Sequence, residues 1–272
     1  MLSKMNTIHW LLVLTSGLAT ADAVQAAESG DTPDVQTIVA KANVVAYYQG
    51  DDGKAKVKMT ITDKRGQKRD REFIILRKDV ADGGDQNYFV YFQRPPDVRR
   101  MTYLVQKHTA IDKDDDRWLY MPAIDRVNRI AAGDKRTSFV GSDFLYEDVS
   151  GRSLDEDTHE LTQTTDTMFI VKNVPKKPDS VEFSYYTVTI DRKNYVPTKM
   201  EFFDKEGKLY RTIESQKVEV IQEFPTVTKS VVQDLKTGSK TEMEFSDVQY
   251  NIKIGDVFEE RYLRRPPREA MR

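Results

Sequence analysis

Residues 54–62 of this 272-residue chain, Lys54-Ala55-Lys56-Val57-Lys58-Met59-Thr60-Ile61-Thr62, give the clearest indication of its fold. Its apolar residues alternate with lysine and threonine, and a period of two is typical of a β-strand with one buried and one solvated face. The polar turn Asp63-Lys64-Arg65-Gly66 follows directly. A short turn of this kind predicts a hairpin, so the next strand should pair with the first in the antiparallel sense.

The same pattern repeats along most of the chain. Further strands are predicted near 70–77, 87–93, 101–108, 117–121, 126–130, 159–165, 168–174, 181–190, 197–203, 208–214, 217–223, 227–234 and 240–250. Polar turns at 191–194, 204–207 and 237–239 predict further hairpins. So many antiparallel strands must curl or split in order to cover their apolar face.

Only three segments are predicted to be helical. Thr32-Pro33 opens the first, whose apolar residues recur every three or four positions from Val35 to Ala46 before Gly50 ends it. The other two run from Ser142 to Val149 and from Asp256 to Leu263. The expected fold class is therefore mainly β (α+β): a half-open, strongly curved antiparallel β-barrel of about eleven or more strands, with helices on its concave side. No linker or repeat divides residues 27–272, which are expected to form a single domain.

The first 26 residues are expected to be a cleavable signal peptide. Lys4 precedes an apolar stretch at 8–18 that is too short to span a bilayer, and small residues lead to a cleavage site after Ala26. An uncleaved N-terminal anchor is the alternative. No later apolar run is long enough to cross a membrane, so the mature chain is predicted to be a periplasmic protein.

Composition excludes several classes of function. The chain has 42 Lys+Arg against 44 Asp+Glu, and a net charge of −2 gives no indication of nucleic acid as a partner. It has no cysteine, which removes disulfides, thiolate catalysis and cysteine zinc sites.

Catalytic motifs are missing as well. His108 and His159 stand alone in strand patterns, and Ser142 lacks the second glycine of a nucleophile elbow. Gly83-Gly84 lies in an acidic loop that would repel phosphate. The sequence thus predicts neither an enzyme nor a cofactor.

Three aspartates have the spacing of the first calcium ligands of an EF-hand loop. After Asp112, Asp114 and Asp116, however, the glycine and glutamate positions of the loop hold Arg117 and Ala123. A solvated acidic turn is the better interpretation, and no metal site is expected.

Aromatic residues exceed what one buried face of a sheet needs. The chain has 12 Phe and 13 Tyr, and several strands are apolar at successive positions. Such strands are either covered on both sides or line a cavity, and composition leaves both interpretations open.

The order of the central segments resembles the outer-membrane lipoprotein-sorting protein family of the LolA-like superfamily. The resemblance rests on residues 116–123, 126–130 and above all 138–148, Ser-Phe-Val-Gly-Ser-Asp-Phe-Leu-Tyr-Glu-Asp. The segment Phe258-Glu259-Glu260-Arg261-Tyr262-Leu263 is similar to the usual end of these proteins, and the likeness extends over roughly 33–264. The resemblance implies a secreted, non-enzymatic protein whose half-open barrel holds acyl chains.

This resemblance suggests a function and its alternative. The first is a periplasmic carrier that binds the acyl chains of a lipid or lipoprotein and transfers it between an inner-membrane transporter and the outer membrane. The second is an accessory or lipid-sensing subunit of a resistance-nodulation-division (RND) type transporter, which would be the partner in either case.

Two sets of residues are candidates for the site. The candidate cavity lining is Trp118, Tyr120, Met121, Phe139, Phe144, Leu145, Phe183, Tyr185 and Phe202. The candidate gate, a short helix able to plug the barrel, comprises Gly141, Ser142, Asp143, Phe144, Tyr146, Glu147 and Asp148. An ordinary surface helix closing the barrel end is the alternative for the second set.

Overall fold

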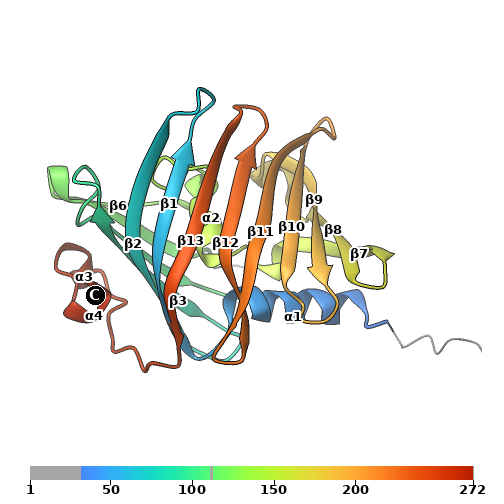
Figure 1. Ribbon diagram of the computed structural model, residues 1–272, viewed down its shortest axis with the longest axis horizontal. Helices are drawn as coiled ribbons and strands as arrows, with labels where there is room; N and C mark the ends of the chain where they lie inside the picture. Colours follow the sequence, from blue (N-terminus) through green and yellow to red (C-terminus); the bar gives the residue numbers. More distant parts are fainter. Residues whose placement is uncertain (1–31, 111–112, 272) are drawn as a thin grey trace, which may run out of the picture. The chain divides into compact units, whose positions relative to one another are not determined.

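Antiparallel strands form one continuous sheet that curls strongly without closing (Figure 1). The computed structural model describes residues 32–110 and 113–271, and the predicted signal peptide lies outside them. Within these residues the sheet has thirteen strands: β1(Asp52–Thr62), β2(Lys68–Asp79), β3(Gln86–Arg94), β4(Thr102–Lys107), β5(Asp116–Met121), β6(Arg126–Arg129), β7(Asp157–Thr164), β8(Met168–Pro175), β9(Phe183–Asp191), β10(Pro197–Asp204), β11(Leu209–Ile221), β12(Phe224–Asp234) and β13(Ser239–Tyr250). The predicted fold class is confirmed.

Two meanders share the sheet. The strand order is β6-β5-β4-β3-β2-β1-β13-β12-β11-β10-β9-β8-β7, so the first strand of one meander pairs with the last strand of the other. In the β1–β13 pair Val57 lies opposite Phe245 and Met59 opposite Met243. Because paired residues face the same side of a sheet, this register directs an apolar row to the concave side.

One predicted strand boundary is wrong. The sequence predicts separate strands at 208–214 and 217–223, whereas β11 runs unbroken from Leu209 to Ile221. Its pairing with β12 shifts register between Ser215 and Lys217 and again before Val218. Such bulges interrupt the alternation of side chains without ending the strand. The sequence pattern therefore predicts two strands where the structure has one.

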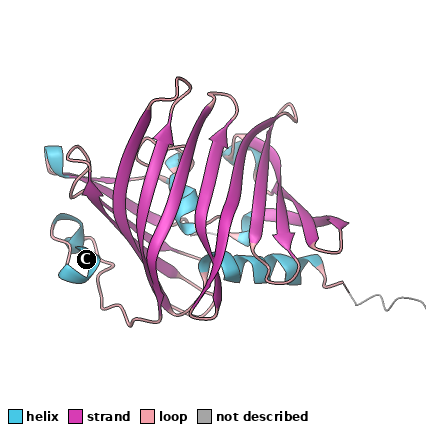
Figure 2. Cartoon of the chain, in the orientation of Figure 1, coloured by secondary structure: helices cyan, strands magenta, loops and turns pink. Residues whose placement is uncertain are grey.

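The helices are few and mostly short (Figure 2). The longest is α1, Val35–Tyr47, whose N-cap Asp34 accepts a hydrogen bond from the Thr37 N–H at 2.9 Å. The prediction that Thr32-Pro33 opens this helix is therefore wrong, since the helix starts after both residues. A carboxylate at this position satisfies a free N–H of the first turn. The others in the described residues are α2(Tyr146–Ser150), α3(Arg261–Arg264), α4(Arg268–Met271) and the 3-10 turns η1(Pro122–Ile124), η2(Ala132–Asp134), η3(Leu154–Glu156) and η4(Pro178–Ser180).

Two predicted helices are shorter than expected. In place of a helix from Ser142 to Val149, α2 starts at Tyr146, because the preceding residues form a turn in which the Ser142 hydroxyl donates to the Phe139 carbonyl at 2.7 Å. In place of Asp256 to Leu263, the helical residues are those of α3 and α4.

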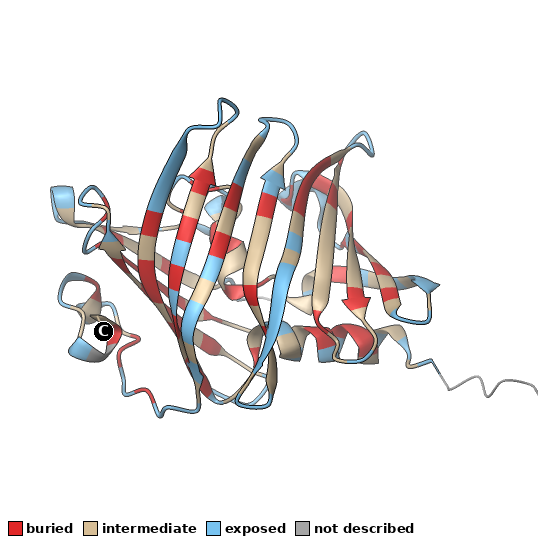
Figure 3. Cartoon of the chain, in the orientation of Figure 1, coloured by how far each residue is buried: buried red, intermediate tan, exposed pale blue. Residues whose placement is uncertain are grey.

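Both faces of the sheet are covered in part, and buried residues occur at successive positions of several strands (Figure 3). This explains why several strands are apolar at successive positions. On the concave side Met59, Phe92, Tyr103 and Phe139 belong to one buried cluster. On the outer side the C-terminal segment packs Ile254, Val257, Phe258, Leu263 and Ala270 against Ile74, Leu76, Phe89 and Leu104.

Candidate functional site

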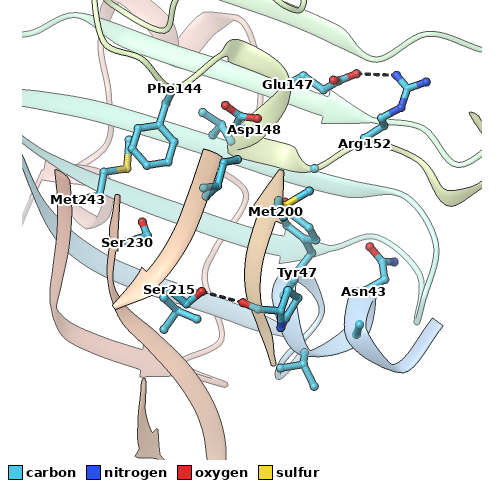
Figure 4. A pocket seen from close by; sticks show the side chains of 18 of the residues that line it. Asn43, Tyr47, Phe144, Glu147, Asp148, Arg152, Met200, Ser215, Ser230 and Met243 are labelled. Carbon is cyan, nitrogen blue, oxygen red and sulfur yellow. Dashed lines mark hydrogen bonds and ion pairs between the residues drawn. The ribbon is translucent and has the colours of Figure 1, made fainter. Parts of the chain in front are cut away.

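A cavity of about 420 Å³ lies between the concave face of the sheet, helix α1 and the segment around α2 (Figure 4). Its size lies within the range of small-molecule sites in proteins. Most of its lining is apolar, and the apolar side chains come from elements distant in sequence: Val39, Ala42, Val45, Phe73, Val90, Phe139, Phe144, Val149, Val171, Val188, Ile190, Met200, Phe202, Ile213, Met243 and Phe245.

Helix α1 supplies one wall of the cavity. Ile38, Val39 and Ala42 pack against Phe169 and Val171 of the sheet, and this contact holds the helix in place. Ala42 and its neighbours along one side of the helix face the cavity. The small alanine side chains leave space there that larger residues would fill.

The connection between the two edge strands supplies another wall. It leaves β6 at Arg129 and reaches β7 at Asp157, and it crosses the concave side between them. We call residues 134–152 of this connection the plug segment. Phe144 of this segment points toward Met243 in the cavity (Figure 4).

Polar contacts tie the plug segment to the sheet. The Asp143 carboxylate accepts hydrogen bonds from Ser239 and Thr241 of β13. Asp148 forms a buried ion pair with Arg211 of β11 and also accepts from the Leu145 N–H at 2.7 Å. The segment is therefore attached at several points beside Phe144.

Glu147 is the centre of a buried ionic cluster at the cavity wall. Its side chain is 3% exposed, and its carboxylate forms ion pairs with Arg136, with Lys135 at 3.2 Å and with Arg152 at 3.3 Å. Burial alone would raise the pKa of Glu147, but the three cations outweigh it and lower the pKa to about 2. Glu147 is thus ionised at neutral pH, and its charge is compensated within the protein.

Tyr47 joins helix α1 to the end of α2. A Cβ atom placed on Gly151, whose φ is 77°, would come within 2.6 Å of the Tyr47 ring. Burial is the main cause that raises the pKa of the Tyr47 hydroxyl, and the nearby Asp148 and Glu147 raise it further. The Tyr47 side chain is thus neutral, and its ring packs against the backbone at position 151, where only glycine fits.

The structure brings only some of the predicted lining residues together. Phe139, Phe144 and Phe202 line the cavity. Met121 packs against the same inner cluster without lining the cavity, and Leu145 lines a separate polar cleft of about 480 Å³.

Four other predicted lining residues lie elsewhere. Trp118 and Tyr120 belong to the outer cluster beneath the C-terminal segment, because alternation along β5 turns Leu119 and Met121 inward instead. Tyr185 stacks on Phe203 at 4.5 Å between ring centroids, and neither ring is part of the lining. Phe183 is fully buried beside Arg136 and Arg152, at 4.8 and 5.5 Å from its ring.

Several lining residues were missed by the sequence reasoning. They include the alanines of α1, Tyr47, Arg152, and the methionines Met200 and Met243. Periodicity identifies the apolar side of α1, yet it gives no signal that this side borders empty space. A gap in packing depends on how distant strands curve, which local patterns do not report.

The two histidines have structural surroundings. His108 lies between Asp85 and Asp116 at 3.1 and 3.2 Å, while His159 contacts the Asn173 side chain at 2.7 Å and the Leu154 carbonyl at 3.0 Å. Among residues 32–110 and 113–271, no group of three or more metal-ligating side chains is found. Asp112 of the EF-hand-like spacing lies outside this part of the chain. A search of the same residues for a helix of membrane-spanning length and hydropathy found none.

Comparisons with known proteins agree with this architecture. Residues 84–265, about two thirds of the chain, match a family model described as "Uncharacterized protein". No curated protein matches the chain.

Solved structures extend the comparison to the whole domain. A DUF1329 family protein from Desulfovibrio piger is 27% identical, with a TM-score of 0.77 over 85% of this chain and 100% of that one. A putative outer membrane lipoprotein-sorting protein domain from Vibrio parahaemolyticus is 23% identical, with a TM-score of 0.75 over the same shares. A LolA superfamily protein from Nitrosomonas europaea is 18% identical, with a TM-score of 0.65 and again 85% and 100% coverage.

The chain belongs to the matched family, and it shares its fold with the lipoprotein-sorting domain and the LolA superfamily protein. The resemblance in residues 116–123, 126–130, 138–148 and 258–263 is thereby confirmed at the level of the fold.

Proposed function

From this family and from the cavity we propose that the chain is a periplasmic carrier that binds the acyl chains of a lipid or lipoprotein. The observation that carries the proposal is the largely apolar cavity of about 420 Å³ between the sheet, α1 and the plug segment. Each buried methylene contributes about 0.8 kcal/mol, so such a space favours a flexible hydrocarbon chain over a polar solute. The names of two structural neighbours, a lipoprotein-sorting domain and a LolA superfamily protein, support the same class of ligand.

The charged groups at the cavity wall leave its interior suited to a neutral chain. Glu147 is compensated by three cations and Asp148 by Arg211. A buried charge without a partner would instead select a charged ligand. The apolar part of a ligand therefore defines what the cavity binds, and catalysis has no part in the proposal.

The proposal also covers delivery of the bound ligand. The proposal includes cleavage of residues 1–26 and transfer of the ligand between an inner-membrane transporter of the RND type and the outer membrane. Release requires an acceptor that buries the chain equally well, since no energy source is invoked. In the alternative role, an accessory or lipid-sensing subunit would bind the transporter tightly whether or not lipid fills the cavity.

The cavity is tested by filling it. Ser230 of β12 lines the cavity, is half-buried and has no hydrogen bond through its hydroxyl in the described residues. Ser230→Phe should reduce binding of a fluorescent fatty-acid probe at least about tenfold, because the ring occupies the space of several methylenes. Gln233→Phe, at an exposed position on the same strand, should bind the probe as the wild type does.

The same measurement can also contradict the proposal. Probe binding that is equal in the wild type and in Ser230→Phe, with both proteins folded by circular dichroism, would show that lipid does not occupy the cavity. Native mass spectrometry of protein purified from its own periplasm would identify the bound lipid.

A further inference from the structure

The three segments at one end of the sheet carry arginine as their only basic residue. These are the β3–β4 turn at 94–101, the η1–β6 connection at 122–129 and the C-terminal residues 259–271. Together they hold nine arginines and no lysine: Arg94, Arg99, Arg100, Arg126, Arg129, Arg261, Arg264, Arg265 and Arg268. The guanidinium group differs from the ammonium group in its planar fork of donors, which binds phosphate through two hydrogen bonds.

Contacts bring the three segments to one place, at the end where Figure 1 shows α3 and α4 beside the tip of β6. Thr102, two residues after Arg100, pairs with Tyr120 and donates to the Leu263 carbonyl at 2.7 Å. Arg264 joins the C-terminal segment to the η1–β6 connection through Asp125, at 3.2 Å. Arg126 is the next residue after Asp125.

Five of these arginines are exposed and have no ion pair in the described residues. We call them the arginine surface: Arg99, Arg100, Arg126, Arg265 and Arg268. The acids of the same segments do not balance them, since Asp97 pairs with Arg71, Asp125 with Arg264 and Glu259 with Arg261. Glu260 and Glu269 are two further acids against five cations.

An apolar side chain stands among these charges. Ile124 is 63% exposed in η1, two residues before Arg126. An aliphatic side chain next to basic residues is typical of surfaces that lie on a bilayer. The aliphatic side chain enters the headgroup layer, and the basic side chains bind the lipid phosphates.

From these observations we infer that the arginine surface, with Ile124 at its tip, docks on a bilayer that contains anionic phospholipid. The guanidinium groups of the arginines would donate hydrogen bonds to the phosphate groups of the lipid. The surface is separate from the cavity, as none of its residues lines that space. Docking would hold the carrier at a membrane, and it needs no lipid inside the protein.

Vesicle sedimentation tests the inference with the full mature chain. The probes are phosphatidylcholine vesicles with and without phosphatidylglycerol. The wild type should bind only the phosphatidylglycerol vesicles, and binding should fall as salt rises because the attraction is screened. Replacing Arg99, Arg100, Arg126 and Arg265 together by glutamine should weaken binding at least about tenfold.

A matched variant controls for net charge. Lys176, Lys177, Lys193 and Lys208 are exposed, have no ion pair in the described residues and lie on the β8–β11 part of the sheet. Their replacement by glutamine removes the same charge and should leave vesicle binding within about twofold of the wild type, since attraction falls off within a Debye length. Ile124→Ser should weaken binding without changing its salt dependence.

Each contrary result overturns the inference. Failure of the wild type to bind the anionic vesicles would do so, as would equal losses in the arginine and lysine variants. Binding of the wild type to polyglutamate or RNA but not to vesicles would assign the surface to a different partner. Binding of the fatty-acid probe is measured separately, so failure here is distinguishable from failure of the proposed carrier function.

Discussion

Glu147 shows how one buried residue can stabilise the wall of the cavity. Its carboxylate meets three cations, and Arg136 and Arg152 also hold Glu182, Glu156 and Asp157. Glu147→Gln removes the one carboxylate that all three cations share and puts an uncharged amide in its place. We expect Glu147→Gln to lower the free energy of unfolding by about 3 kcal/mol at neutral pH, measured by urea denaturation.

The effect of Glu147 should also depend on pH. Its pKa is about 2 in the folded protein, below the ordinary value of 4.5. The stabilisation is therefore complete above pH 4.5 and is lost as the pH falls toward 2. The difference in stability between wild type and Glu147→Gln should shrink over that range, and a constant difference would contradict the assignment.

Gly151 tests the contact between α1 and the plug segment. Gly151→Ala combines a positive φ of 77° with a Cβ atom 2.6 Å from the Tyr47 ring, whereas Gly207→Ala has a φ of 76° and nothing within 4 Å. Gly207→Ala should cost about 1 kcal/mol from backbone strain alone. Gly151→Ala should cost at least about 1 kcal/mol more because the Tyr47 ring must move. Equal melting temperatures of the two variants would show that the contact is unimportant.

We propose that the plug segment acts as a gate through Phe144. This side chain is 8% exposed and lines the cavity. A charge at this position is costly to bury, so Phe144→Glu should favour an open segment and release the fatty-acid probe at least about tenfold faster.

The control for this variant is Lys208→Glu. It changes charge at an exposed turn, whereas Lys205 in the same turn donates to the carbonyls of Pro178 and Phe183 and is unsuitable. If Phe144→Glu does not fold, Phe144→Ala should show the same direction of change. Retention equal to the wild type in a folded variant would exclude the gate.

Element order could be predicted from the sequence because alternation and turn chemistry are local. Each short turn between strands, such as 63–66, indicates its own hairpin. The lining of the cavity could not be predicted in the same way. Trp118 and Phe139 are both large aromatic residues of the segments that carry the family resemblance, yet Trp118 packs under the C-terminal residues and Phe139 lines the cavity. Which face of a curled sheet borders a space depends on contacts across the whole chain.

The C-terminal segment completes the fold on the outer face of the sheet. It follows β13, which pairs with β1 in the middle of the sheet, and it covers β2 to β5. The inner cavity can therefore stay open while the outer face of these strands is closed. Strands β2 to β5 are thus packed on both faces, with the inner cluster on the concave side and the outer cluster beneath the C-terminal segment.

Truncation tests the role of the outer core. Removing residues 255–272 exposes Ile74, Leu76, Phe89 and Leu104, which are at most 1% exposed in the intact chain. An apolar patch of this kind promotes association, so the truncated protein should elute as oligomers in size-exclusion chromatography and bind a hydrophobic dye. Leu263→Ala keeps the segment and should only lower the free energy of unfolding, by about 2 to 5 kcal/mol, while the protein keeps the elution volume of the wild type. A truncated protein that elutes and melts like the wild type would show that β2 to β5 need no cover, and that the outer cluster does not stabilise the curled sheet.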